Sequence, residues 1–94
     1  MITVIGKIRL PVEQMDVARE AIVKAVEATR AEEGCITYDL HQNHEDPAHF
    51  MFYENWESRE LWQVHMSAPH LLAYRAATED AVDGFTLHEM SHIG

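Results

Sequence analysis

His65 is the residue in this chain best suited to moving a proton near neutral pH. It follows Leu61 and Trp62 at helical spacing, so it is expected to border the apolar interior. A histidine in such a place can accept a proton from a phenol or from a carbon acid. The alternative is a structural, half-buried histidine bonded to a backbone carbonyl, and the sequence leaves both possibilities open.

Glu54 is the second candidate for catalysis, because it shares a strand face with Phe52 and Trp56. A carboxylate on an aromatic face is expected either to be paired or to have a raised pKa. We predict that Glu54 orients His65, as a partner carboxylate orients a base. A purely structural pairing with an arginine or a backbone amide is the alternative.

Aromatic and polar side chains around these two residues form a predicted site for a flat, apolar substrate. The candidates are Phe52, Tyr53, Trp56, Trp62, His70 and Tyr74. The two tryptophans and the phenylalanine are expected to form a wall, and the tyrosines to hydrogen-bond a substrate oxygen. The histidine follows Pro69 at a helix start, where it also fits a simple turn. At this spacing the aromatic residues also suit an ordinary core.

The remaining histidines do not predict a metal site. His88 and His92 share a strand face, but four residues of strand separate them by roughly 13 Å, which is too far for one ion. His41, His44 and His49 flank a turn without a known ligand spacing. The chain has no glycine-rich phosphate loop either. We therefore expect neither a metal nor a cofactor.

Composition is typical of one globular domain spanning residues 1–94. Sixteen acidic against seven basic residues give a formal charge of −9, which argues against nucleic acid or an anionic membrane as a partner. The single Cys35 cannot form an intramolecular disulfide. The first residues lack a signal-peptide pattern, and no apolar run approaches a membrane span. Cytoplasmic residence is expected.

Changes of periodicity predict the elements that position these residues. Apolar alternation predicts strands over residues 2–10, 35–43, 50–57 and 85–93, and helical spacing predicts a helix from Met15 to about residue 30. Ser58 is a good N-cap for a short helix through His65, and Pro69 suits the first position of another. The order β-α-β-β-α-α-β is that of a ferredoxin-like α+β domain with helices on one face of an antiparallel sheet.

The predicted third strand carries large side chains on both faces. Phe52 and Trp56 lie on one face, while Met51 and Tyr53 lie on the other. A sheet exposed to water on one side does not need this pattern. We expect helices on the first face and another subunit on the second.

Three segments in order resemble the antibiotic biosynthesis monooxygenase family. Residues 33–40, EGCITYDL, resemble its entry to the second strand, and residues 52–56, FYENW, resemble its third strand. Residues 65–70, HMSAPH, resemble its helix break, and the order of elements matches over nearly the whole chain. The resemblance implies a homodimer whose two sheets form an α+β barrel, with a pocket in each subunit between sheet and helices.

Members of the family include cofactor-free monooxygenases of quinols and polycyclic aromatics, heme degraders, and isomerases of phosphorylated autoinducer-2. The heme-degrading branch carries a tryptophan and its histidine ligand where this chain has His65 and Arg75, and an arginine cannot be the axial ligand. The favoured hypothesis is oxidation of a quinol- or anthrol-type substrate by O2, with His65 as the base. An isomerase of a small phosphorylated carbonyl compound and a non-catalytic dimer that binds a small ligand remain the alternatives. A basic anion site near His65 would favour the isomerase, and a wholly aromatic pocket the oxygenase.

Overall fold

The computed structural model describes residues 1–94, apart from the side chain of Val17. Its elements are β1 (Ile2–Arg9), a 3-10 turn (Val12–Gln14), α1 (Met15–Arg30), β2 (Cys35–Gln42), β3 (His49–Trp56), α2 (Arg59–Met66), α3 (Pro69–Thr78) and β4 (Phe85–Met90). This order confirms the predicted α+β pattern. The ends differ by a few residues, and the last strand stops at Met90 rather than near Ile93.

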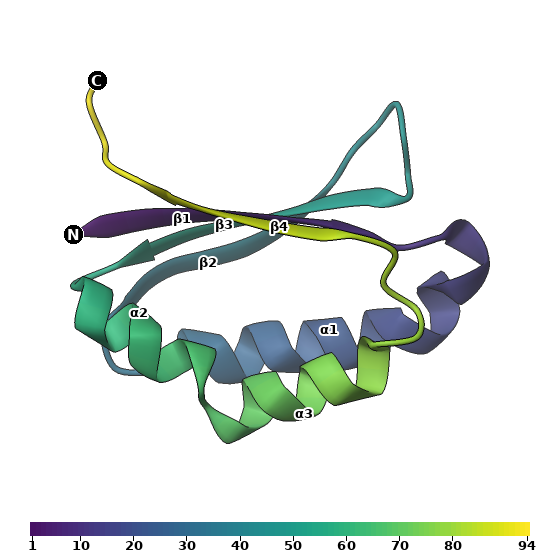
Figure 1. Ribbon diagram of the computed structural model, residues 1–94, viewed down its shortest axis with the longest axis horizontal. Coiled ribbons are helices and arrows are strands. Elements are labelled where there is room, and N and C mark those ends of the chain that lie inside the picture. Colours follow the sequence, from purple (N-terminus) through teal and green to yellow (C-terminus); the bar gives the residue numbers. More distant parts are fainter.

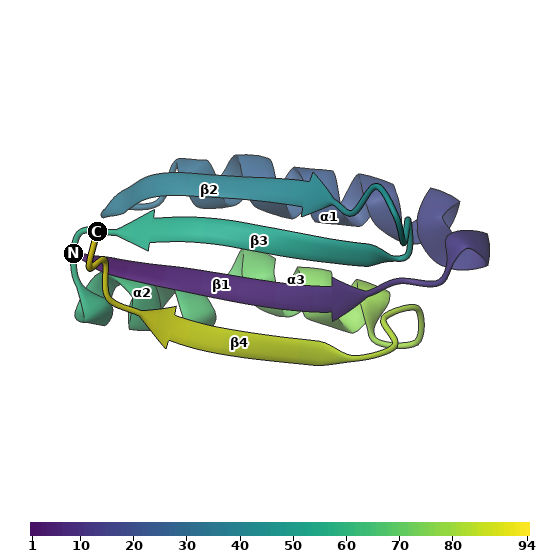
Figure 2. The ribbon, with the colours of Figure 1, turned by 90° about the horizontal axis from the view of Figure 1, so that it is seen from above.

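The four strands form one antiparallel sheet in the order β2-β3-β1-β4, as Figure 2 shows. Strand β1 lies in the middle, with Val4 opposite Glu54 on β3 and opposite Glu89 on β4. A bulge between Cys35 and Thr37 interrupts the pairing of β2 with β3. Ile36 lies at this bulge and is 54% exposed, although simple alternation along the strand would place it on the buried face of Tyr38.

All three helices lie against one face of the sheet (Figure 1). The even-numbered side chains of β1 and β3 point toward them, so Val4, Ile8, Phe52 and Trp56 are buried. Ile22 of α1 joins them in the core. The opposite face of the sheet carries no helix, in agreement with the predicted two-layer arrangement.

The segment around α2 is set by three local features. The Ser58 side chain accepts a hydrogen bond from the Leu61 amide at 3.2 Å and caps α2, as predicted. Pro69 occupies the first turn of α3, where its missing N–H costs nothing. Gly34 has φ +84°, and a Cβ there would lie 2.4 Å from the Leu61 side chain. The turn before β2 therefore requires glycine both for its backbone and for the space that Leu61 fills.

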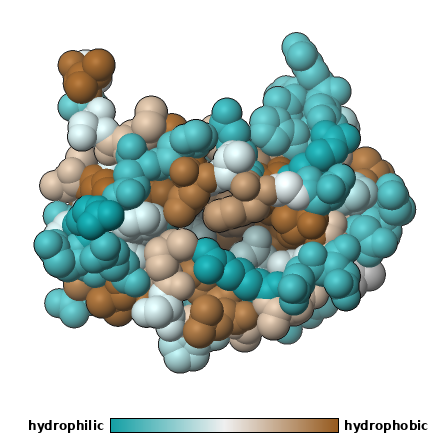
Figure 3. Space-filling model, viewed as in Figure 1, coloured by the Kyte–Doolittle hydropathy of each residue, from teal (hydrophilic) through white to brown (hydrophobic). Residues whose placement is uncertain are grey.

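Figure 3 looks onto the β4 edge of the molecule. Apolar side chains gather in the middle of this edge, while the β2–β3 connection that projects above the sheet is hydrophilic. Within the described residues, no helix is long and apolar enough to cross a membrane.

Candidate active site

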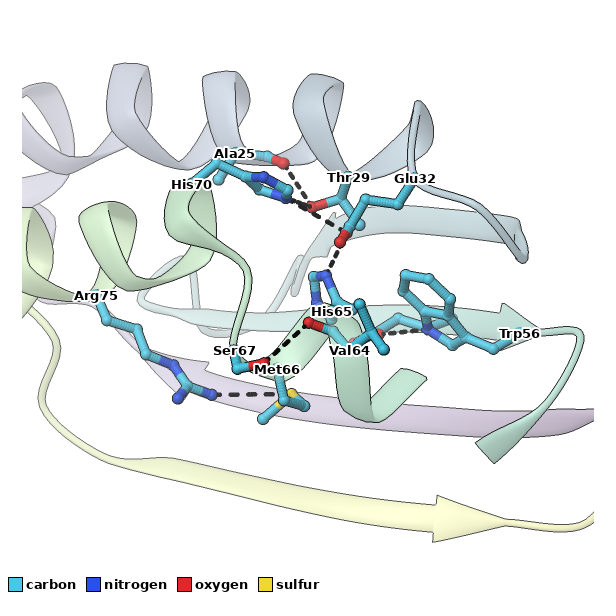
Figure 4. A network of polar contacts seen from close by, with 11 residues as sticks. Ala25, Thr29, Glu32, Trp56, Val64, His65, Met66, Ser67, His70 and Arg75 are labelled. Atoms are coloured by element: carbon cyan, nitrogen blue, oxygen red, sulfur yellow. Dashed lines mark hydrogen bonds and ion pairs between the residues drawn. The ribbon is translucent and has the colours of Figure 1, made fainter. Parts of the chain in front are cut away.

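His65 lies on the inner face of α2 with only 2% of its surface exposed. Its Nδ1 is 2.5 Å from Oε2 of Glu32, which lies in the turn after α1 (Figure 4). The Trp56 ring packs against the imidazole at a centroid distance of 4.8 Å, and the Tyr38 ring meets it edge-on at 5.4 Å. A polar contact on one side and aromatic rings on the other hold the ring in one orientation.

The contact with Glu32 determines which nitrogen of His65 can act. A carboxylate accepts hydrogen bonds, so Nδ1 carries the hydrogen and Nε2 keeps its lone pair. Burial lowers the pKa of His65, while the hydrogen bond to Glu32 opposes that shift. The ring is therefore a neutral proton acceptor at Nε2 near neutral pH, with a carboxylate placed to stabilise the imidazolium once it forms.

Glu54 has a different partner from the one predicted. Its Oε1 accepts a hydrogen bond from the Trp56 indole at 3.0 Å, and its side chain is 4% exposed. Burial raises the pKa of Glu54 to about 7, although the Trp56 hydrogen bond acts in the opposite direction. The predicted raised pKa is therefore present, but the carboxylate that orients His65 is Glu32.

His65 and Glu54 line the same small cavity between the sheet and the helices, which we call the inner pocket. Phe52 and Tyr74 of the predicted set also line it, together with Tyr38. Its volume of about 30 Å³ holds one or two water molecules but no aromatic ring. Burial raises the pKa of the Tyr38 and Tyr74 phenols, so both stay protonated and able to donate a hydrogen bond.

A larger outer pocket of about 620 Å³ adjoins it between α3 and the start of β4. Both pockets share Tyr74, Arg75 and Phe85 as lining residues. The Arg75 guanidinium lies 5.9 Å from the centre of the Phe85 ring, and its Nη2 lies 3.9 Å from the Met66 sulfur. Arg75 and Phe85 are both exposed and form a partition between the two pockets.

Arg75 brings an uncompensated positive charge to this partition. Three of the five arginines pair with carboxylates, namely Arg9 with Asp46, Arg30 with Asp39 and Arg59 with Glu89. Among the described residues, no carboxylate lies within 4.0 Å of the Arg75 guanidinium. The lining near His65 is therefore not wholly aromatic.

The other predicted binding residues are spread over three places. Trp56 is fully buried behind His65, and Trp62 is 6% exposed in the core, away from the lining of either pocket. Tyr53 lies on the sheet face opposite the helices, with 41% exposure. Within a single chain it is therefore on the other side of the sheet from His65. His70 lies beyond Glu32, with Nε2 3.3 Å from the same Oε2.

Sequence reasoning missed Glu32 and Tyr38 as members of this site. The alternation of β2 could have identified Tyr38, because it shares its strand face with the apolar Leu40. In the sheet it lies opposite Glu54 of β3. Glu32 had no such signal, because it occupies a four-residue turn, residues 31–34, whose direction depends on how α1 packs beside α2 and α3. A further cavity of about 320 Å³, lined by Leu10 and Ile22 among others, contains none of the predicted site residues.

Comparison with known proteins gives matches in sequence. A family model described as antibiotic biosynthesis monooxygenase matches residues 1–77. The Mycobacterium tuberculosis protein "Putative monooxygenase Rv0793" is 38% identical over 63 residues, which are 63% of this chain and 61% of that protein. The Synechocystis protein sll1783 is 31% identical over 45 residues, which are 48% of this chain and 31% of that protein. These sequence matches thus span less than two thirds of the length of each curated relative.

Solved structures match over almost the whole chain. A crystal structure of an antibiotic biosynthesis monooxygenase is 27% identical, covers 100% of both chains and superposes with a TM-score of 0.94. The structure of Rv0793 from Mycobacterium tuberculosis has a TM-score of 0.89 at 23% identity and covers 99% of this chain and 94% of its own. At that identity the second likeness shows the fold alone.

Proposed function

The chain belongs to the antibiotic biosynthesis monooxygenase family, and from this premise we propose that it oxidises a quinol- or anthrol-type aromatic with O2 in the cytoplasm, without a cofactor. The observation that carries the proposal is the buried His65, whose Nδ1 is bound to Glu32 and whose Nε2 is left as a proton acceptor inside an aromatic-lined site. Such a base can take the proton of a bound phenol, with the Glu32 carboxylate stabilising the imidazolium.

The proposed reaction converts a phenol with an unsubstituted ring carbon into a quinone. His65 takes the phenolic proton, and the phenolate passes one electron to O2. The resulting radical pair combines at the ring carbon, and the peroxide anion takes the proton back from the His65 imidazolium to give a hydroperoxide. Loss of water from it leaves a carbonyl, so one oxygen atom enters the product and the other leaves as water. The substrate supplies all the electrons, and aromatic walls keep water away from the reactive pair.

Substrate access requires the inner and outer pockets to join. The inner pocket alone, at about 30 Å³, excludes any aromatic substrate, whereas the outer pocket of about 620 Å³ lies within the range of small-molecule sites. Displacement of Phe85 and Arg75 opens the way between them. Tyr74 lines both pockets and is the hydroxyl best placed to bind a substrate oxygen during entry.

We further propose a homodimer formed through the bare face of the sheet. This face carries Ile5, Met51, Tyr53 and Met90, with Tyr53 41% and Met90 47% exposed. Apolar side chains gathered on an uncovered sheet face are typical of a surface that a partner buries. A second copy of the chain offers the same face and closes a two-sheet barrel.

Arg75 supports a second candidate, the isomerase of a small phosphorylated carbonyl compound. The guanidinium lies at the partition beside the His65 pocket without a carboxylate partner among the described residues. Arginine is well suited to binding a phosphate, and His65 would shuttle a proton between neighbouring carbons. This candidate needs no O2.

Isotope labelling distinguishes the two reactions. The metal-stripped protein is incubated under ¹⁸O2 with hydroquinones and anthrols, or with phosphorylated hydroxyketones, and products are analysed by mass spectrometry. The oxygenase predicts one ¹⁸O atom per product molecule and enzyme-dependent O2 uptake above autoxidation. Turnover of the phosphorylated compounds at equal rate without O2 would instead establish the isomerase. Tight binding of the aromatics without turnover would identify a ligand-binding protein.

A further inference from the structure

Glu32, His65 and His70 place three metal-binding atoms together at the back of the site. Figure 4 shows the Glu32 carboxylate between the two imidazoles. Its Oε2 is 2.5 Å from Nδ1 of His65 and 3.3 Å from Nε2 of His70, and one ligand atom from each residue lies within 4.8 Å of the others. We propose that these three residues form a binding site for one divalent transition-metal ion, and that the bound ion prevents His65 from acting as a base.

The geometry needs only a small adjustment to accept an ion. In a tetrahedral site with ligand bonds of about 2.1 Å, two ligand atoms lie roughly 3.4 Å apart. The Glu32–His70 separation of 3.3 Å already fits, and the Glu32–His65 separation of 2.5 Å must open by about 0.9 Å. The side chains of Glu32 and His70 are 16% and 29% exposed, so both can rotate while the buried His65 stays in place.

The donor set selects the class of metal. Two imidazoles and one carboxylate suit Zn²⁺, Co²⁺ or Fe²⁺, whereas Mg²⁺ and Ca²⁺ prefer oxygen ligands. Water completes the coordination from the exposed side, since Glu32 and His70 both reach solvent. His65 lies in the last turn of α2. The carbonyl end of a helix favours a nearby positive charge, such as a bound metal ion.

This site departs from the expectation that the chain holds no metal. That expectation depended on ligand spacings along the sequence. The three ligands instead come from separate segments, namely the turn after α1, the end of α2 and the start of α3. The sequence indicated only other roles for the two histidines, a base for His65 and a substrate contact for His70. The folded chain brings them to one carboxylate oxygen.

The bound ion acts on the base through the imidazole itself. The metal takes the place of the proton on Nδ1 of His65, because both compete for the same lone pair. A neutral imidazole bound through Nδ1 carries its hydrogen on Nε2, so His65 can no longer accept a proton from a phenol. This second part of the proposal rests on the proposed function, whereas metal binding does not.

Direct binding measurements test the site. The full chain, free of any histidine tag and stripped with a chelator, is titrated with ZnCl2 by calorimetry and with CoCl2 by visible absorption. We expect one equivalent of Zn²⁺ with a Kd of about 1 µM or tighter, and the d–d bands of tetrahedral Co²⁺. His70→Ala and Glu32→Gln should each weaken binding at least about 30-fold. His88→Ala, on the other side of the sheet, is the matched control and should bind as the wild type.

Three results would overturn the metal site: no binding tighter than about 100 µM, equal binding by His70→Ala, or loss of binding in His88→Ala. The last two would mean adventitious binding by surface histidines.

Zinc inhibition is then measured by O2 uptake with and without one equivalent of Zn²⁺. A wild-type rate that zinc leaves unchanged, in a protein that binds it, would refute the effect on the base. Zinc binding in a protein without oxygenase activity would support the site and contradict the proposed function.

Discussion

At the scale of single residues, two carboxyl groups of the site have different roles. The partly exposed Glu32 bonds to His65 and sets its tautomer, whereas the buried Glu54 bonds to Trp56 and has a pKa raised to about 7. The sequence predicted that Glu54 is either paired or raised in pKa, because a strand face shared with aromatic rings implies burial, and the structure shows both. The sequence could not identify Glu32, because a turn residue has no periodicity from which its direction can be inferred.

Glu32→Gln should lower the oxidation rate more than Glu54→Gln. The amide cannot stabilise the imidazolium as a carboxylate does, so we expect kcat to fall about 10- to 1,000-fold with little change in KM. Steady-state O2 uptake measures both constants. A Glu32→Gln enzyme with wild-type kcat would show that His65 does not depend on this partner.

Glu54→Gln should stabilise the fold at alkaline pH. The folded pKa of about 7 lies above the ordinary value of 4.5, so ionisation costs more in the folded than in the unfolded chain. The free energy of unfolding should therefore fall as the pH rises from 4.5 to about 7 and then stay level. Relative to the wild type, the variant should gain up to about 3 kcal/mol between pH 4.5 and pH 8. Urea unfolding at both pH values measures this gain, and a pH-independent difference would contradict it.

At the scale of elements, periodicity predicted the four strands and helix α1. The N-cap Ser58 and the first-turn Pro69 correctly predicted where α2 and α3 begin. The bulge at Ile36 escaped prediction, because a bulge depends on pairing with a distant strand rather than on local alternation. One of the contacts that hold helix α2 in place is the packing of Leu61 against Gly34. This contact joins the turn that carries Glu32 to the helix that carries His65.

Gly34→Ala should destabilise the protein more than Gly84→Ala. Both glycines have positive φ, so both substitutions strain the backbone by about 1–3 kcal/mol. A Cβ at Gly34 also meets Leu61 at 2.4 Å, whereas one at Gly84 has 3.9 Å to Arg9. The clash should add about 1–3 kcal/mol, measurable by chemical denaturation. Equal losses in the two variants would mean that Leu61 moves aside without cost.

At the scale of the whole molecule, helices cover one face of the sheet and leave the other face bare. The sequence predicted this from the large side chains on both faces of β3, and the structure confirms the helical layer (Figure 1). What covers the other face stays a prediction. Strand alternation also explains why Tyr53, which was predicted to bind the substrate, lies on the face opposite the helices: odd-numbered side chains of β3 point to that face.

Tyr53→Glu should weaken the proposed dimer at least about tenfold, because it buries a charge in an apolar interface. Light scattering after size exclusion should give twice 10.8 kDa for the wild type. Val23→Glu, exposed at 44% on α1, is the matched control and should remain dimeric. A monomeric wild type, or an equally dimeric Tyr53→Glu, would place the interface elsewhere or remove it.

The most direct test of the account is O2 uptake by His65→Gln with the best hydroquinone or anthrol substrate, corrected for autoxidation. Glutamine is close in size to histidine and preserves a donor toward Glu32, but it cannot take up the phenolic proton. The account predicts that kcat falls at least about 100-fold, that the folded state is retained by circular dichroism, and that His88→Ala keeps the wild-type rate. Enzyme-dependent oxidation by His65→Gln at the wild-type rate would contradict the assignment of His65 as the base.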